Sequence, residues 1–392
     1  MIYLDNAATT VHKPPSVLRA QRQASRCAGN AGRGGHTLSL AAAQTLYRCR
    51  CAAAEFFGMD LPERVVLTMN ATHALNLVLF GILQRGDRVL YSDLAHNSVR
   101  RPIAALRERG VKSEMYSVLE KGALLPQAEI MRRLEKLLET PTRMIALTHV
   151  SNLCAAREPL EKIAALSKKR GVLLLADASQ SAGILPLSMK IGIDYLCCAG
   201  HKGLYGPMGT GMLITKNGEK LESLIQGGTG TRALELDQPR EMPEYLESGT
   251  QNVPGILALG AGMDFVRTNG EYMLREREMR HIRRVYEAFK NMPHVVLYTA
   301  MPDTMYFVPV LGFNVRGMQS EEVGEVLAKR NIAVRCGFHC APLVHRKMGT
   351  DGETPGGAVR VSPGAFTTDR DITELIRTVY SLRAESAARK VE

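Results

Sequence analysis

The sequence has 392 residues, of which 45% are hydrophobic and 23% charged, and its formal net charge is +11. This size and composition are typical of a globular protein with two domains. No apolar run is long enough to span a bilayer, and the first residues lack the basic and apolar segments of a secretory signal. We therefore expect a cytoplasmic protein without a membrane partner. The positive charges are scattered and aromatic residues make up only 5% of the chain, which argues against nucleic acid as a partner.

In the first half of the chain, apolar runs that end in turn residues alternate with helical patterns. Residues 1–15 are expected to form an extended arm, and a helix is expected to start at Ser16. The expected strands are 64–68, 88–92, 144–147, 172–176, 194–199 and a short one after 211, and the expected helices cover 39–57, the segment after 69, 120–139 and 158–170. This alternation predicts a mostly parallel sheet with right-handed crossovers.

The second half of the chain has a looser pattern, which indicates an α+β arrangement. A glycine-rich loop at 227–231 precedes a helix that is expected to start near Pro254. We then expect helices at 271–290, 320–330 and 369–387, and strands at 295–298, 304–313 and 357–362.

The stretch from residue 172 to residue 215 brings a carboxylate and a lysine to the ends of strands. Asp177 ends the strand expected at 172–176, Gln180 follows in the turn, and Lys202 follows the strand expected at 194–199. Open α/β sheets build their sites at the carboxyl ends of the strands. Pyridoxal 5'-phosphate (PLP) needs a lysine that binds it covalently and an acid beside its pyridinium nitrogen. The sequence therefore favours a PLP site over an aspartate and a lysine on unrelated turns.

A second feature suits the phosphate group of this cofactor. The strand expected at 64–68 leads through small residues into a helix near Ala71 and Thr72. A helix that starts behind a strand offers backbone N–H groups to an anion. Thr72 would then bind the phosphate, although a threonine can also simply begin a helix.

The eight cysteines contain no paired C-x-x-C spacing of a structural zinc site, so we expect free thiols and no metal. Cys197 and Cys198 lie in an apolar strand and are expected in the core. Cys49 and Cys51 are expected to pack within a helix.

These motifs together resemble a known family. The segment Asp177-x-x-Gln180, followed by Ala199-Gly200-His201-Lys202-Gly203, resembles the class V aminotransferases, and most closely the SUF-type and NifS-like cysteine desulfurases. The opening Tyr3-Leu4-Asp5-Asn6-Ala7-Ala8-Thr9-Thr10 is similar to the start of the same family, so the resemblance covers essentially the whole chain. It implies the α/β PLP fold type I, with a large domain over 16–255 that holds a mostly parallel sheet. A smaller α+β C-terminal domain is then formed by 1–15 plus 256–392.

The resemblance also implies roles for single residues. Lys202, Cys340 and His96 are the implied catalytic residues, with His96 stacked over the pyridine ring. Asn152 is implied to hydrogen-bond the phenolic oxygen of the ring. The implied cofactor-binding residues are Ala71, Thr72, His96, Asn152, Asp177, Gln180, His201, Lys202 and Thr250, of which Thr250 reaches the phosphate in the partner subunit of a homodimer.

The segment Arg335-Cys336-Gly337-Phe338-His339-Cys340 resembles the catalytic-cysteine loop of the SUF-type enzymes, which places the nucleophile at Cys340. Arg335 and His339 could supply the positive charge that favours the thiolate. Cys336 is an extra thiol that could resolve a persulfide as a disulfide. The implied substrate-binding residues are Asn152, Arg360, Arg335, His36 and Arg33, where Arg360 holds the substrate carboxylate with its guanidinium fork.

The expected function is therefore that of a PLP-dependent cysteine desulfurase, a sulfurtransferase that converts L-cysteine to L-alanine and leaves a persulfide on Cys340. Its partner would be a sulfur-acceptor protein, and the sulfur would serve iron–sulfur cluster assembly or thiolation. The alternatives are a selenocysteine lyase acting on L-selenocysteine and a class V aminotransferase or epimerase that does not use Cys340. A non-catalytic scaffold is a further alternative, which the presence of Lys202, Asp177 and Arg360 together argues against.

Overall fold

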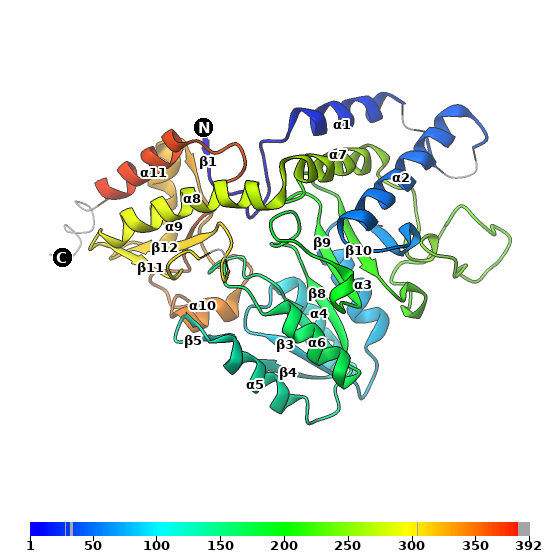
Figure 1. Cartoon of the computed structure of the whole chain (residues 1–392), viewed down its shortest axis with the longest axis horizontal. Coiled ribbons are helices and arrows are strands. Elements are labelled where there is room, and N and C mark those ends of the chain that lie inside the picture. Colours follow the sequence, from blue (N-terminus) through cyan, green and yellow to red (C-terminus); the bar gives the residue numbers. More distant parts are fainter. Residues whose placement is uncertain (28, 32–33, 304, 383–392) are drawn as a thin grey trace.

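A seven-stranded sheet forms the centre of the larger part of the computed structural model, which describes residues 1–27, 29–31, 34–303 and 305–382 (Figure 1). The strand order is β2-β10-β9-β8-β7-β3-β4. Strands β9, β8, β7, β3 and β4 run parallel to one another, whereas β10 is antiparallel to both β2 and β9. The strands are β2 (Val65–Thr68), β3 (Arg88–Ser92), β4 (Lys112–Tyr116), β7 (Met144–Thr148), β8 (Leu173–Asp177), β9 (Tyr195–Ala199) and β10 (Gly211–Thr215).

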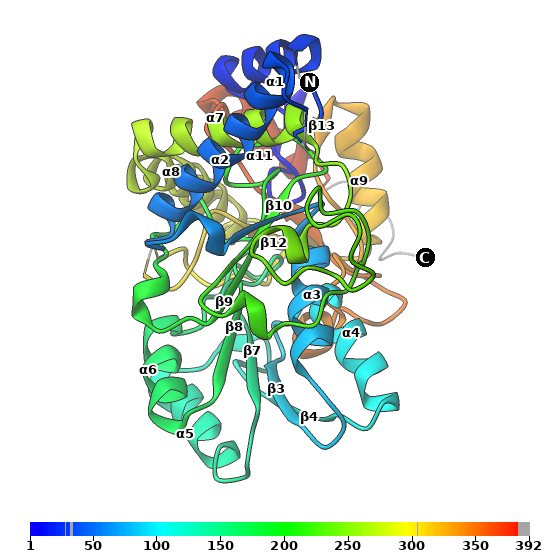
Figure 2. The same cartoon turned by 90° about the vertical axis from the view of Figure 1, so that its right-hand side faces the viewer.

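Helices cover both faces of this sheet, and Figure 2 shows α5 and α6 on one side and α3 and α4 on the other. The side chains of each strand alternate between the two faces, so successive residues enter different apolar clusters. Cys197 joins the cluster under α3 and α4, Cys198 joins the opposite one, and both are fully buried, as expected. The helices are α1 (Pro15–Cys27), α2 (Thr37–Phe56), α3 (Ala71–Ile82), α4 (Asn97–Glu108), α5 (Gln127–Leu137), α6 (Leu160–Arg170) and α7 (Val253–Asn269).

The C-terminal part has a small antiparallel sheet in the order β11-β12-β14 with its own apolar core. Its elements are α8 (Glu271–Lys290), β11 (Val295–Leu297), β12 (Leu311–Val315), α9 (Ser320–Lys329), β13 (Ile332–Ala333), α10 (Pro342–Met348), β14 (Val359–Val361) and α11 (Asp369–Ser381). Strand β1 (Ile2–Tyr3) pairs in parallel with β13, so the start of the chain lies against this part. That pairing agrees with grouping 1–15 with 256–392. The domain boundaries themselves stay a prediction, because α7 crosses residue 255 and packs against α1 and α2 (Figure 1).

The mostly parallel sheet and the helix at 271–290 are confirmed, but two predicted elements start later than expected. The helix predicted over 120–139 begins only at Gln127, because Lys121 and Gly122 adopt positive φ angles of 48° and 81° in a tight turn. This turn joins two short strands, β5 (Leu119–Glu120) and β6 (Ala123–Leu124). The strand predicted over 304–313 begins only at Leu311.

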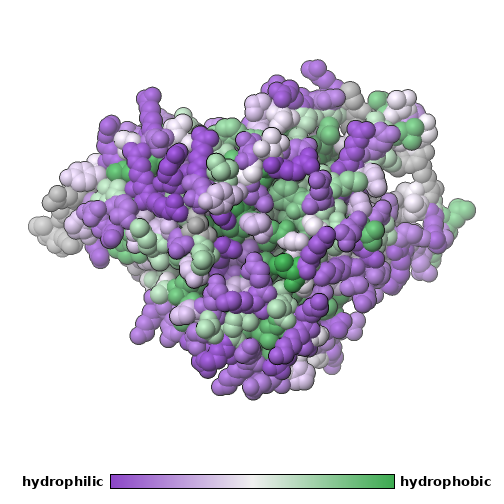
Figure 3. All heavy atoms as spheres, viewed as in Figure 1, coloured by the Kyte–Doolittle hydropathy of each residue, from purple (hydrophilic) through white to green (hydrophobic). Residues whose placement is uncertain are grey.

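On the face shown in Figure 3, hydrophilic residues cover most of the surface and hydrophobic residues form small patches among them. Among the described residues, no helix is long and apolar enough to cross a membrane.

A buried ion pair joins α2 to the segment before α7. Arg50 donates to both carboxylate oxygens of Glu247, with 2.6 Å between Nη2 and Oε2. The same carboxylate accepts the backbone N–H of Leu67 on β2. Because both side chains are buried, removal of either would leave a buried group without its partner.

We expect Glu247→Ala to lower the free energy of unfolding by about 3 kcal/mol, since it leaves the Arg50 charge and the Leu67 N–H unpaired. Denaturant titration followed by circular dichroism measures this loss. The matched control is Glu235→Ala, because Glu235 forms an exposed pair with Arg232 and should change stability by less than about 0.5 kcal/mol. Equal losses for the two variants would contradict the prediction.

Candidate active site

A cavity of about 240 Å³ lies where the carboxyl ends of β7, β8 and β9 face the N-terminus of α3 and the C-terminal part of the chain. This is the place where open α/β sheets bind ligands. The cavity brings together eleven of the residues predicted from the sequence: Ala71, Thr72, His96, Asn152, Asp177, Gln180, His201, Lys202, Arg335, Cys340 and Arg360.

Asp177 and Lys202 both face this cavity, as the strand ends predicted. Asp177 is the last residue of β8, and its Oδ1 accepts the N–H of Ser179 at 3.0 Å and the hydroxyl of the same residue. Lys202 follows β9, where burial lowers the pKa of its amine to about 8 and the nearby Asp177 carboxylate opposes that shift. A lysine with a lowered pKa is partly neutral near physiological pH, which is what a nucleophilic amine requires.

His96 is the N-cap residue of α4, and its Nδ1 accepts the N–H of Ser98 at 3.0 Å. Burial lowers the pKa of the imidazole, so the ring is neutral at physiological pH. The N-cap bond fixes the ring at the wall of the cavity, just after the carboxyl end of β3. A neutral, fixed ring can stack on a flat ligand and exchange a proton with it.

The other end of the cavity suits an anion. Ala71 and Thr72 form the first turn of α3, where backbone N–H groups and the helix dipole favour negative charge. His201 lies nearby, and its buried Nδ1 has no hydrogen-bond partner among the described residues. Burial, together with the charges of Lys202 and Lys13, lowers the pKa of His201 to about 4. The lysine, the carboxylate, the helix terminus and this unpaired nitrogen fit the groups of PLP.

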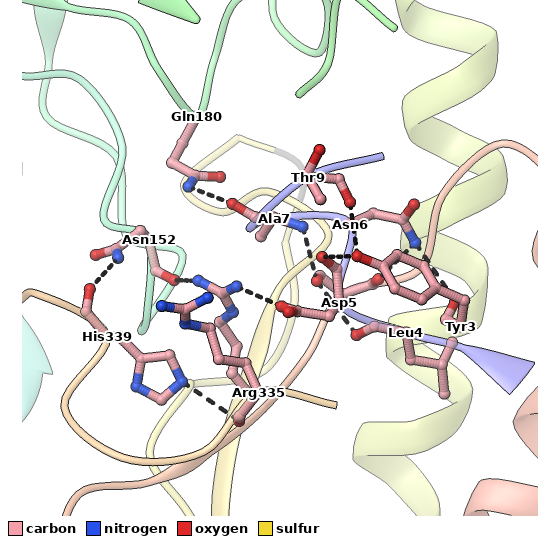
Figure 4. A network of polar contacts seen from close by, with 12 residues as sticks. Tyr3, Leu4, Asp5, Asn6, Ala7, Thr9, Asn152, Gln180, Arg335 and His339 are labelled. Atoms are coloured by element: carbon pink, nitrogen blue, oxygen red, sulfur yellow. Dashed lines mark hydrogen bonds and ion pairs between the residues drawn. The ribbon is translucent and has the colours of Figure 1, made fainter. Parts of the chain in front are cut away.

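Gln180 and Asn152 connect the sheet to other parts of the chain. Gln180 Nε2 donates to the carbonyl of Ala7 at 2.9 Å, and Asn152 Nδ2 donates to the carbonyl of His339 at 2.7 Å (Figure 4). Asn152 Oδ1 is buried and has no partner among the described residues, so it can accept a bond from a ligand.

Arg360 lies on β14 and is only 1% exposed. Its Nη2 donates to Asp5 Oδ1 at 2.6 Å and its Nη1 donates to the carbonyl of Asn152 at 2.9 Å. Its Nε is buried and unpaired among the described residues. Arg335, which is exposed, forms an antiparallel backbone bridge with Arg360. Two guanidinium groups therefore serve one side of the cavity.

Cys340 lines the cavity from the loop between β13 and α10 and is exposed. Both His339 and Cys340 adopt the left-handed conformation, with φ angles of 51° and 54°. The loop is held by a bond of 2.9 Å from the N–H of Asn97 to the carbonyl of Cys340 and by stacking of His339 on His345. The thiol is thus placed between the cavity and the surface.

The structure corrects the expected charge of His339 and gives no support to the expected role of Cys336. His339 was expected to supply positive charge, but burial and the charge of Arg360 lower its pKa well below the ordinary value, so it is neutral. Only Arg335 remains for that role. The thiol of Cys336 packs beside Gly324 of α9, and Cys336 is not among the described residues that line the cavity. The hypothesis that it resolves a persulfide gains no support from this position.

Two of the predicted residues, Thr250 and His36, do not line the cavity of their own chain, and a third is not described by the structure. Thr250 is exposed near Glu247, beside a separate hollow. His36 is exposed and caps α2 by accepting the N–H of Ser39. Arg33 lies outside the described residues. Their roles, with Thr250 acting in a partner subunit, stay predictions.

Sequence reasoning missed the role of the N-terminal arm in this site. Asp5 pairs with Arg360, and Ala7 lines the cavity and accepts a bond from Gln180. The signal was present, because the opening motif contains both residues, but the motif gave no indication of which atoms they contact. Ser179, which donates to Asp177, was missed as well.

Comparisons with known proteins agree with this geometry. The model of the family described as aminotransferase class-V matches residues 2–375. A probable cysteine desulfurase of Methanothermobacter thermautotrophicus is 31% identical over 97% of this chain and 94% of its own length. A cysteine desulfurase of Pectobacterium carotovorum is 30% identical over 96% of this chain and 91% of its own length. The apo structure of cysteine desulfurase from Thermococcus onnurineus NA1 superposes with a TM-score of 0.89 at 28% identity, covering 98% of this chain and 95% of the other. The chain therefore belongs to the aminotransferase class-V family of PLP-dependent enzymes.

Proposed function

We propose that this protein is a PLP-dependent cysteine desulfurase that converts L-cysteine to L-alanine and transfers the sulfur to Cys340. The observation that carries the proposal is the presence of Cys340 in the same cavity as Lys202, Asp177 and Arg360. A transaminase would need the lysine, the acid and the arginine but would have no use for a thiol at this place. The reaction balances as L-cysteine plus the Cys340 thiol giving L-alanine plus the Cys340 persulfide.

The residues around the cofactor have distinct tasks in this proposal. When bound, PLP would withdraw electrons from the Cα of the substrate, which makes the Cα proton acidic and lets Cβ take up the electron pair and a proton when its bond to sulfur breaks. Lys202 binds the cofactor and moves the Cα proton, and Asp177 keeps a proton on the pyridinium nitrogen. His96 stacks on the ring, while Gln180 and Asn152 orient it. The phosphate is held by Ala71, Thr72 and His201, with Thr250 of the partner subunit.

Positive charge on two arginines holds the substrate in this proposal. Arg360 and Arg335 bind the α-carboxylate, for which a guanidinium fork is the matching shape. Asn152 Oδ1 is available to the substrate as well. The Cys340 thiolate then attacks the substrate sulfur, breaks its bond to Cβ and keeps it as a persulfide. The exposure of Cys340 lets an acceptor protein take that sulfur. Arg33 and His36 are further substrate-binding residues in this proposal, as the family resemblance implies.

We further propose that the protein is a cytoplasmic homodimer that supplies sulfur for iron–sulfur cluster assembly or thiolation. Thr250 is exposed and is not among the residues that line the cavity of its own chain, and the loop before it exposes Leu234 and Leu236 completely, which supports contact with another subunit. A sulfur-acceptor protein would be the second partner.

The pKa of Lys202 gives this proposal a pH dependence. The neutral amine is the form that binds PLP, and a pKa lowered to about 8 makes roughly a tenth of it neutral at pH 7 and most of it neutral at pH 9. We expect the rate of PLP uptake by the cofactor-free protein to rise about tenfold between pH 7 and pH 9 and then to level off. Cofactor absorbance after rapid mixing measures this rate. A rate that still rises steeply above pH 9 would indicate an ordinary lysine.

The decisive experiment incubates the PLP-loaded protein with L-cysteine and a reductant and measures alanine and sulfide. Equal amounts of both products support the desulfurase. Activity on L-selenocysteine that exceeds activity on L-cysteine at least about tenfold would favour a selenocysteine lyase. Pyruvate formed from L-alanine in the presence of a keto acid, without sulfide from L-cysteine, would favour an aminotransferase. A protein that binds no PLP would be a scaffold.

A further inference from the structure

The N-terminal arm lines part of the site that the proposed function uses, through Ala7 and Ala8. Figure 4 shows Asp5 and Ala7 of the arm with Asn152, Gln180 and Arg335 on one side of them. Beyond Ala7, the hydroxyl and the N–H of Thr10 both donate to the carbonyl of His201, each at 3.0 Å. The arm therefore contacts the lysine segment, the glutamine and the substrate arginine within a few residues.

Asp5 is held firmly by the fold on both sides. Strand β1 ends at Tyr3, and Asp5 then forms a parallel bridge with Ser362, directly after β14. Arg360 belongs to β14, so the backbone fixes the distance between the two charged residues. Tyr3 adds a hydroxyl that donates to the carbonyls of Asp5 and Thr9.

The guanidinium of Arg360 has only one charged partner in the hydrogen-bond pattern of the described residues. Asp5 accepts from Nη2 at 2.6 Å, the carbonyl of Asn152 accepts from Nη1 at 2.9 Å, and Nε remains buried without a partner. Two anchored nitrogens leave the planar group no freedom to rotate. The unpaired Nε is thus held in one orientation, and a buried donor without a partner gains most from a new acceptor.

We propose that Asp5 is the positioning residue for substrate recognition: by anchoring Nη2 it orients the Arg360 guanidinium so that its free Nε edge receives the α-carboxylate of the amino acid. This proposal rests on the proposed function only in its choice of L-cysteine as substrate. Binding of any α-amino acid tests it.

Asp5 could act in the opposite way, as an internal carboxylate that competes with the substrate for Arg360. The two roles predict opposite changes in KM when Asp5 is lost. A positioning residue strengthens substrate binding, so its loss raises KM. A competitor weakens binding, so its loss lowers KM.

The test uses Asp5→Asn in the PLP-loaded protein. The amide removes the charge but keeps the size of the side chain. We expect the KM for L-cysteine to rise about tenfold while kcat changes less than about threefold, because no hydrogen bond among the described residues joins Asp5 to Lys202 or Cys340 and its charge is the last-named influence on the pKa of Lys202. Asp60→Asn is the matched control, since Asp60 is exposed and pairs only with Lys190 among the described residues, and it should change neither constant.

A binding measurement separates this inference from the proposed function. L-alanine and ethylamine differ only in the carboxylate, and their binding can be followed through the absorbance of the bound cofactor without any sulfur chemistry. Asp5→Asn should weaken the binding of L-alanine about tenfold and leave the binding of ethylamine unchanged. If the wild type released no sulfide, the proposed function would fail, but these two ligands would still decide the role of Asp5.

Several results would overturn the proposal. They are an unchanged or lower KM for L-cysteine in Asp5→Asn, and equal weakening of L-alanine and ethylamine. If Asp5→Asn does not fold, Asp5→Glu keeps the charge and displaces the carboxylate by one methylene. That variant should weaken the binding of L-alanine about threefold and leave the binding of ethylamine unchanged. An unchanged affinity for L-alanine would overturn the proposal.

Discussion

Replacing Lys202 with alanine is expected to lower the rate of alanine formation from L-cysteine by at least about a thousandfold. The amine is asked to hold the cofactor covalently and to move the Cα proton, and a positioned acid–base group alone contributes about 10²–10⁴-fold. No second amine replaces it in the cavity, because Lys202 is the only lysine among the described residues that line it. The absorption band of covalently bound cofactor should disappear together with the activity.

The control for this variant is Lys190→Ala, which removes an exposed lysine. It should keep both the absorption band and the rate. A Lys202→Ala protein that retained the band would show that another lysine holds the cofactor. One that lost the band but kept the rate would show that PLP is not used.

Replacing Cys340 with serine is expected to abolish sulfide release, also by at least about a thousandfold, while cofactor binding remains. A serine hydroxyl is nearly isosteric but is almost fully protonated at neutral pH, and it cannot attack and retain the substrate sulfur as a thiolate can. The loop should keep its shape, because its fixed contacts are the carbonyl of Cys340 and the ring of His339. Absorbance, sulfide release and mass spectrometry for a gain of one sulfur atom together measure the outcome.

Cys336→Ala provides the comparison within the same loop. Its thiol packs beside α9, so this variant should still gain sulfur on Cys340 and still release sulfide. Sulfide release that survives in Cys340→Ser would remove Cys340 from the mechanism. Loss of sulfur transfer in Cys336→Ala would restore a role for the second thiol.

The sheet and most of the site could be predicted because their signals are local. An apolar strand followed by Asp177, or by Gly200-His201-Lys202, places a side chain at a strand end whatever the rest of the chain does. Parallel pairing then brings these ends to one edge. The helix at 271–290 was also predictable, since its apolar residues recur along one face and Gly270 marks its start.

The features of the site that could not be predicted depend on contacts between segments that are distant in the sequence. The pairing of Asp5 with Arg360 joins residues 355 positions apart, and no local pattern reports it. The charge state of His339 could not be predicted from the sequence either, because burial in the folded protein lowers the pKa of this histidine and keeps it neutral. The helix predicted over 120–139 starts seven residues late for a local reason, because Gly122 lies in a turn that requires a positive φ.

The pairing of the first strand with β13 has a consequence for how the enzyme is made. Tyr3 pairs with Ala333, and Asp5 bridges to Ser362, so the two ends of the polypeptide meet only after nearly all of it has left the ribosome. Contacts of such long sequence separation form late, because loop closure must come first. The arginine side of the site is therefore completed only after residue 362 has left the ribosome, when the central sheet can already have folded. Capture of the cofactor by the strand ends does not have to wait for the part of the protein that selects the substrate.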